Sequence, residues 1–172
     1  MALNILGYAC YSTYTTSLFW NSFIRDEYDE VFSSNLVTSQ DCFFALHGAA
    51  LTLFTIYQCL IYERGGQIIA LPTKLFVGCV LITCALYAAL ILFVGEKGPD
   101  VPGTASSLFS WLFFVYWLSL VKLAVTVSKY IPQAVLNCKN QSTVGWSILN
   151  VLLDLTGGML SIAQLLLVRL SP

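Results

Sequence analysis

Residues 108–138 read "LFSWLFFVYWLSLVKLAVTVSKYIPQAVLNC", and this stretch decides the fold class. It is almost entirely apolar as far as Val127, yet it contains two lysines and then a proline followed by a glutamine. A bilayer core of about 30 Å requires roughly 20 apolar residues per helix. A helix satisfies its own backbone hydrogen bonds where water is absent. The stretch therefore predicts a membrane-spanning helix with costly polar residues in its middle.

The composition of the whole chain supports this class. Of its 172 residues, 58% are hydrophobic and only 10% are charged, whereas a soluble domain carries roughly 25% charged residues. A polytopic membrane protein is therefore expected, with the lipid bilayer as a partner and without nucleic acid. A single histidine and six cysteines without metal-like spacing argue against an enzyme, a metal site or a disulfide framework. No cofactor is expected, apart from protons as coupling ions.

Apolar segments recur along the chain between loops rich in charge, glycine or proline. The loops with the clearest composition are "RDEYDEVFSSNLVTSQ" (25–40), "ERGGQ" (63–67) and "GEKGPDVPGTASS" (95–107). The pattern predicts an all-α integral membrane protein with one membrane domain over residues 1–172. Its five predicted spans cover about 2–24, 42–62, 68–94, 108–138 and 146–170.

Polar residues of the fourth span share one face. Lys122, Thr126, Lys129 and Gln133 are spaced by four, three and four residues, and Asn137 follows after four more. Lys122 lies in the middle of the span, where a charge costs about 2.5–3.5 kcal/mol. We therefore expect this stripe to face a bundle interior or a wet cavity. Lys129 is nearer the helix end, so snorkelling to the interface is an alternative for it.

The fifth span carries a second polar stripe. Asn150, Asp154, Gly157 and Ser161 repeat the same spacing, and Asp154 is the only acid within the predicted spans. A carboxylate in an apolar environment must be paired or protonated. Such a group suits a proton-coupled transporter, because it can take a proton from one side and release it to the other. A structural ion pair with a lysine of the fourth span is the alternative.

Two pairs of residues predict places where the helices bend or approach closely. Pro132 removes a backbone hydrogen bond beside Gln133, which favours a kink that acts as hinge and gate. The alternative is that the proline ends the helix near the membrane surface. Gly157 and Gly158 follow Asp154 directly and allow close helix packing or a local bend.

The first span contains an echo of the fifth. "ALNILGY" (2–8) aligns with "LLDLTGG" (152–158) at an offset of 150 residues, which makes Asn4 the counterpart of Asp154. Repeated halves are common in transporters, with the substrate site at their interface. Tyr8, Tyr11 and Thr15 continue from Asn4 with the spacing of the other stripes.

A longer motif resembles a known family. "KYIPQAVLNCKNQSTVGWSILNVLLDLTGG" (129–158) resembles the second PQ-loop of the cystinosins, proton-coupled cystine exporters of lysosomes and vacuoles. "ALHGAALTLFTIYQCLIYERGGQ" (45–67) and "NILGYACYSTY" (4–14) are similar to the middle region of the same family. The likeness covers most of the chain.

The resemblance implies a PQ-loop helical bundle of seven helices in a 3+1+3 arrangement, in which the five spans correspond to helices two to six. It implies that Asp154 is the proton-coupling acid. By the same resemblance, the positions that line the site for cystine or a related amino acid are Lys122, Lys129, Tyr130, Asn137 and Asn150. The internal echo adds Asn4 to this set.

The resemblance also implies a lysosomal or vacuolar membrane, with residues 63–67 and 139–145 on the cytosolic side. Compared with the family pattern, the chain is expected to be truncated at both ends, without the first PQ helix and the last helix. Two main functions follow: a proton-coupled cystine transporter, or a transport-dead form that associates with a full-length relative. If the truncation prevents sorting, the endoplasmic reticulum is the expected location instead. A PQ-loop carrier for another amino acid or a sugar is a third interpretation.

Overall fold

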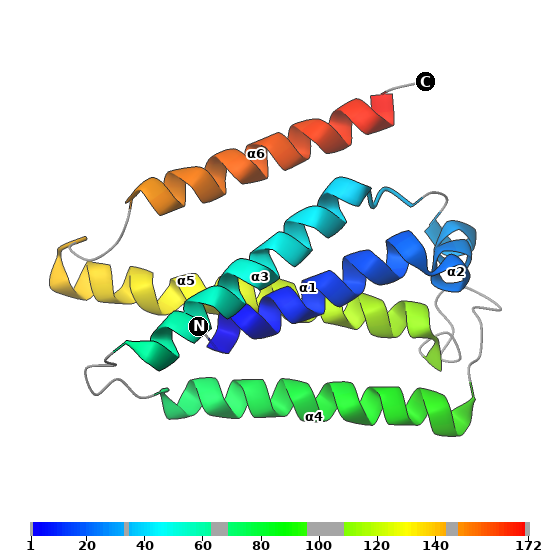
Figure 1. The fold of residues 1–172 in the computed structure, drawn as a ribbon, viewed down its shortest axis with the longest axis horizontal. Coiled ribbons are helices and arrows are strands. Elements are labelled where there is room, and N and C mark those ends of the chain that lie inside the picture. Colours follow the sequence, from blue (N-terminus) through cyan, green and yellow to red (C-terminus); the bar gives the residue numbers. More distant parts are fainter. Residues whose placement is uncertain (1, 33–34, 63–68, 96–108, 144–147, 171–172) are drawn as a thin grey trace. The chain divides into compact units, whose positions relative to one another are not determined.

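The computed structural model describes residues 2–32, 35–62, 69–95, 109–143 and 148–170. Helices cover nearly all of these residues, and no strand occurs among them, which confirms the all-α prediction. In chain order the helices are α1 (Ala2–Trp20), α2 (Ser22–Phe32), α3 (Ser39–Ile61), α4 (Leu71–Val94), α5 (Trp111–Asn140) and α6 (Ile148–Leu170) (Figure 1).

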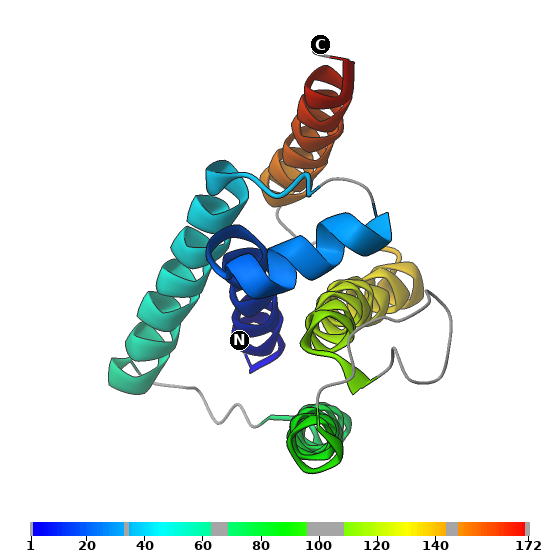
Figure 2. The same cartoon turned by 90° about the vertical axis from the view of Figure 1, so that its right-hand side faces the viewer.

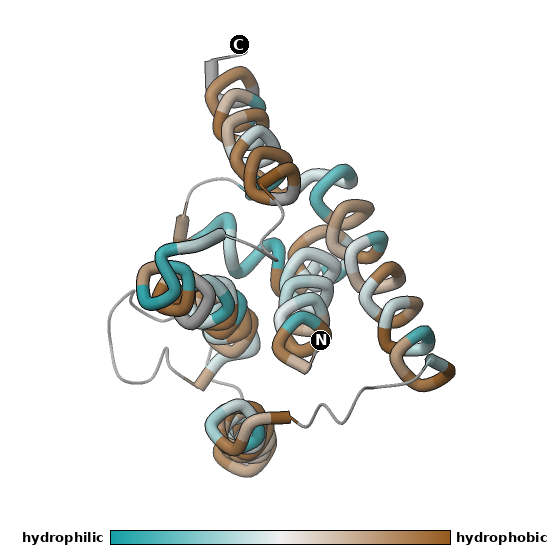
Figure 3. Tube along the Cα trace, turned by 90° about the vertical axis from the view of Figure 1, so that its left-hand side faces the viewer, coloured by the Kyte–Doolittle hydropathy of each residue, from teal (hydrophilic) through white to brown (hydrophobic). Residues whose placement is uncertain are grey.

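Three helices of the described residues, α3, α4 and α5, are long and apolar enough to cross a membrane. Helix α6 contains a shorter apolar stretch, Val151–Leu167. Only 11% of the most apolar window of α4 is buried inside the protein, and its tube is coloured mainly as hydrophobic in Figure 3. Apolar side chains that face outward along a whole helix are typical of a lipid-facing surface. The division into five spans stays a prediction.

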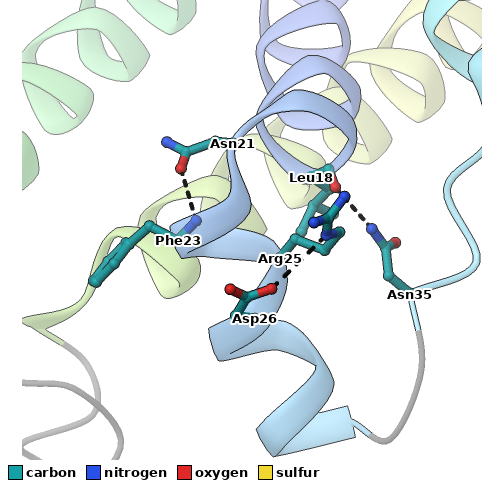
Figure 4. Close-up of polar contacts among 6 residues, drawn as sticks. All are labelled: Leu18, Asn21, Phe23, Arg25, Asp26 and Asn35. Atoms are coloured by element: carbon teal, nitrogen blue, oxygen red, sulfur yellow. Dashed lines mark hydrogen bonds and ion pairs between the residues drawn. The ribbon is translucent and has the colours of Figure 1, made fainter.

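The first helix ends before the end of the predicted first span. The predicted span 2–24 ends as a helix at Trp20, and a separate helix, α2, occupies much of the predicted polar loop 25–40. Asn21 separates the two helices: its Oδ1 atom accepts a hydrogen bond of 3.1 Å from the Phe23 N–H (Figure 4). An asparagine in this position satisfies a free donor of the first turn and starts a new helix.

Helix α2 has one buried face that is apolar apart from Glu27. Ile24, Glu27, Tyr28 and Val31 follow a spacing of three, one and three residues, which places them on one side of a helix. Ile24 and Glu27 are buried, and Tyr28 and Val31 are half-buried. The high charge of residues 25–30 hides this periodicity, so composition alone indicates a loop.

A side chain from beyond α2 reaches back to the end of α1. The Asn35 Nδ2 atom donates a hydrogen bond of 2.8 Å to the Leu18 carbonyl oxygen (Figure 4). The Asn35 Oδ1 atom also accepts a hydrogen bond of 3.0 Å from the Val37 N–H. The chain is thereby held against α1 before α3 begins. Thr38 precedes α3, and its N–H donates to the Asp41 carboxylate at 2.8 Å, as in a capping box.

The chain divides into two compact units, residues 1–129 and 130–172, and the boundary lies within α5. In the first unit α1 packs against α2, α3 and α4, and Figure 2 shows it between its neighbours. Its core has two clusters. One unites α1, α4 and α5 through Leu6, Cys10, Val80, Leu118, Val121 and Val125. The other unites α1, α2 and α5 through Leu18, Ile24, Leu112 and Val115.

In the second unit, α5 continues as a helix through Pro132 to Asn140, two residues beyond the predicted end. Termination of the helix at the proline is therefore excluded, whereas the predicted hinge stays a prediction. The helix ends in a Schellman arrangement. Gln141 has a positive φ of 47°, and the Ser142 N–H donates to the Asn137 carbonyl oxygen at 3.2 Å.

Replacing Ile24 by alanine is expected to loosen α2. The side chain is 6% exposed in the core cluster with Leu18, and removing a buried branched side chain costs about 2–5 kcal/mol in a well-packed core. Amide hydrogen exchange across residues 22–32 should therefore become faster. Phe23→Ala is the matched control, because Phe23 is 54% exposed on the same helix. Equal exchange rates in the two variants would contradict the docking of α2.

Candidate functional site

The lysine in the middle of α5 faces aromatic rings of α1. The Lys122 Nζ atom lies 4.8 Å from the ring centroid of Tyr8 and 5.7 Å from that of Tyr11. These distances fall within the range of a cation–π interaction, which contributes about 0.5–1 kcal/mol at exposed sites and about 2 kcal/mol when desolvated. The half-buried position of Lys122 agrees with the expectation that it faces the helix bundle.

Two glycines allow the helices around this lysine to approach closely. A Cβ atom on Gly7 of α1 would lie 3.1 Å from Val125 Cγ1 and 3.6 Å from Lys122 Cδ. A Cβ atom on Gly48 of α3 would overlap the Tyr8 ring, at 2.6 Å from Cζ and 2.8 Å from Cδ1. Real Cβ atoms essentially never make contacts as short as those at Gly48, so an added side chain there would require a shift of the Tyr8 ring, whereas the contact at Gly7 is only tight.

The polar stripe of α1 has different roles along its length. Asn4 is half-buried one turn before Tyr8, and its role toward substrate stays a prediction. Thr15, at the other end of the stripe, is 1% exposed. Its Oγ1 atom donates to the Tyr11 carbonyl oxygen at 3.0 Å, and its own carbonyl oxygen lies 3.4 Å from the Cys42 thiol donor. This end of the stripe therefore joins α1 to α3.

The α5 stripe continues from Lys122 toward the boundary of the first unit. The Thr126 hydroxyl donates to the Lys122 carbonyl oxygen at 2.9 Å, so it satisfies its own helix backbone. Lys129 is exposed. Its predicted contact with substrate and the alternative of interfacial snorkelling both stay open.

The second unit brings the predicted proton-coupling acid into contact with a tyrosine. The Tyr130 hydroxyl on α5 donates a hydrogen bond to the Asp154 Oδ2 atom on α6. The two residues are 24 positions apart in the chain, and the sequence predicted different roles for them. A phenol O–H is a donor that matches the acceptor oxygens of a carboxylate. The alternative ion pair between Asp154 and a lysine stays a prediction.

Asn137 is the third predicted substrate contact on this part of α5. Its side chain is half-buried, and its Nδ2 atom is buried without a hydrogen-bond partner among the described residues. A buried amide donor without a partner is unfavourable by about 1–3 kcal/mol. The donor is therefore available to a polar ligand.

Several other predicted residues remain without a test. The side chains of Pro132, Gln133 and Asn150 lie outside the described residues. Gly157 and Gly158 belong to α6, and a Cβ atom on either would meet nothing within 4 Å. Their predicted roles in substrate binding, gating and close packing stay predictions.

Sequence reasoning missed the contribution of Gly48. Tyr8 and Tyr11 could be found from their shared spacing with Asn4, although their ring contacts with Lys122 could not. No periodicity marks Gly48, because its importance arises from the approach of α3 to the Tyr8 ring. A lone glycine in an apolar helix is a weak signal that only a packing partner can explain.

The chain is similar to known proteins along nearly its whole length. The family model "PQ loop repeat" matches residues 114–172 and includes Tyr130 and Asp154. The chain is 42% identical over 168 residues to the cystinosin homolog of Dictyostelium discoideum. This alignment covers 97% of the chain and 55% of that relative. It is 40% identical over 169 residues to the cystinosin of Bos taurus, again over 97% of the chain but 42% of the relative.

The chain therefore spans about half the length of these relatives. The similarity reaches plants, with 32% identity over 168 residues to the cystinosin homolog of Arabidopsis thaliana. A family of transporters agrees with the expectation of a membrane protein without enzymatic activity. With the PQ loop repeat and cystinosin similarity along nearly its whole length, the chain belongs to the cystinosin family.

Proposed function

We propose that this chain takes part in proton-coupled transport of cystine across a lysosomal or vacuolar membrane. The hydrogen bond from Tyr130 to Asp154 is the observation that carries the proposal. Within the second unit, it links α5 to α6 through a carboxyl group that can gain and lose a proton. Intramembrane carboxylates of this kind mark proton relays in transporters.

The chemistry of the hydrogen bond suggests how protons act on the helices. Ionised Asp154 can only accept hydrogen bonds, so the Tyr130 phenol is a matched donor. Protonation removes the charge and makes one carboxyl oxygen a donor. The hydrogen bond from the Tyr130 phenol to Asp154 then becomes weaker. The contact between α5 and α6 then depends on proton occupancy, which is the requirement for coupling transport to a proton gradient.

Each unit by itself offers a group that complements an amino acid such as cystine. In the first unit Lys122 supplies a cation for a carboxylate. In the second unit Asp154 supplies an anion for an ammonium group. The buried Nδ2 atom of Asn137 can donate to a carboxylate or carbonyl oxygen. The similarity to cystinosins supports cystine over another amino acid or a sugar.

In proteoliposomes that contain the chain, we expect cystine uptake driven by an acidic exterior. Asp154→Asn should abolish the proton-driven component, because asparagine retains the shape but cannot exchange a proton. Asp29→Asn is the matched control, since Asp29 lies exposed on α2. Radiolabelled cystine uptake measures the effect. Flux no higher than in empty liposomes would exclude transport by this chain alone.

Tyr130→Phe should lower acid-driven uptake by about tenfold, because a hydrogen bond to a charged group contributes about 1.5–3 kcal/mol. The variant retains the aromatic ring and loses only the donor to Asp154. Tyr57→Phe is the control, because Tyr57 is 58% exposed on α3. An unchanged rate in Tyr130→Phe would remove the phenol from the coupling mechanism.

The competing proposal is an interaction partner of a full-length cystinosin relative. It is motivated by the 40% identity of the chain to the bovine cystinosin over a match that covers 42% of that protein. Co-expression should then give a complex that survives affinity purification and changes the flux of the relative. A chain that co-purifies with no relative and leaves its flux unchanged would contradict this role.

A further inference from the structure

Gly48 and Lys122 contact the same tyrosine from two different helices. The backbone of α3 packs at Gly48 against the ring of Tyr8 on α1. The Lys122 ammonium of α5 lies 4.8 Å from the centroid of the same ring. All three residues belong to the unit of residues 1–129. The position of the Tyr8 ring therefore depends on α3, although the lysine whose ammonium lies over the ring is on α5.

The contact at Gly48 is too close for another side chain. The nearest atoms to a Cβ atom there are Cε1, Cζ and Cδ1 of Tyr8, with the last two at 2.6 Å and 2.8 Å. Because the backbone of α3 cannot move without repacking, an added methyl group would turn the ring away from its present position. A glycine is thus needed for the ring to stay below the ammonium.

Other glycines in the apolar helices do not all make such a contact. Gly78 on α4 is also in the middle of an apolar helix, and a Cβ atom there would meet nothing within 4 Å. An alanine at Gly78 adds the same methyl group without a packing consequence. A comparison of Gly48→Ala with Gly78→Ala therefore separates the effect on the Tyr8 ring from a general effect of alanine on helix propensity.

We propose that Gly48 is a positioning residue, which holds the Tyr8 ring so that the ring fixes the Lys122 ammonium where it binds a ligand carboxylate. The ring attracts the cation through its face, and this attraction is strong where water is scarce. A lysine that is held in advance loses less rotamer freedom when the ligand binds. The ligand part of this proposal rests on the proposed transport function, whereas the positioning of Lys122 does not.

The positioning is tested by acylation of lysines with acetic anhydride in the detergent-solubilised chain, read by peptide mass spectrometry. An ammonium held on an aromatic ring reacts slowly, because only the neutral amine attacks the reagent. We expect Gly48→Ala and Tyr8→Leu each to raise the acylation rate of Lys122 by about fivefold. Tyr8→Phe, which retains the ring, and Gly78→Ala should leave the rate unchanged.

Lys129 is the internal control, since it is exposed on the same helix. Its acylation rate should be equal in all variants. An unchanged Lys122 rate in Tyr8→Leu would overturn the proposal, and so would a parallel rise at Lys122 and Lys129, which indicates general loosening. If Gly48→Ala does not fold, the comparison of Tyr8→Leu with Tyr8→Phe still shows whether the Tyr8 ring holds the Lys122 ammonium.

Uptake kinetics test the ligand part separately. Gly48→Ala should raise the KM for cystine by about fivefold and leave the maximal rate nearly unchanged, because the carboxylate contact is lost in the resting complex. A fall in maximal rate with constant KM would overturn the ligand role. If acylation behaves as expected but no variant transports cystine, the positioning of Lys122 stands and the transport function fails.

Discussion

The requirement that polar groups inside an apolar bundle find partners within the protein organises this structure. Lys122 is the clearest case, because its ammonium lies in the middle of an apolar helix and rests against Tyr8 and Tyr11 of α1. Lipid offers neither a counter-charge nor a hydrogen bond, so α1 has to supply the contact. This constraint explains why α1, the most polar of the apolar segments, is enclosed by α3, α4 and α5 (Figure 2).

In the second unit a hydrogen bond provides the polar contact between two helices. Asp154 accepts from the Tyr130 hydroxyl, so the acid of α6 and the PQ-loop segment of α5 depend on each other. Tyrosine suits both positions because a phenol presents an aromatic face to a cation and a hydroxyl to an anion. The two units thus use one residue type for opposite charges, with a ring for Lys122 and a donor for Asp154.

The sequence revealed stripes and helices well, and loops less well. The spacing of Lys122 and Thr126 predicted that they share a face, since a helix places every third and fourth residue together, and both side chains are half-buried. The α2 helix was missed, because its charges dominate the composition while only Ile24 and a few neighbours form the buried face. The contact of Tyr130 with Asp154 could not be predicted from periodicity, since it joins two helices whose rotation depends on packing.

By itself, the sequence determined the membrane class, the long apolar helices and the family, because hydropathy, periodicity and the PQ-loop motif are local properties of the chain. Only the tertiary structure decided which partners satisfy the polar residues. The Tyr8 ring lies against Gly48 of α3 and next to the Lys122 ammonium of α5. Such a contact depends on three segments far apart in the chain, and the distances between them are set by close packing of side chains rather than by sequence spacing.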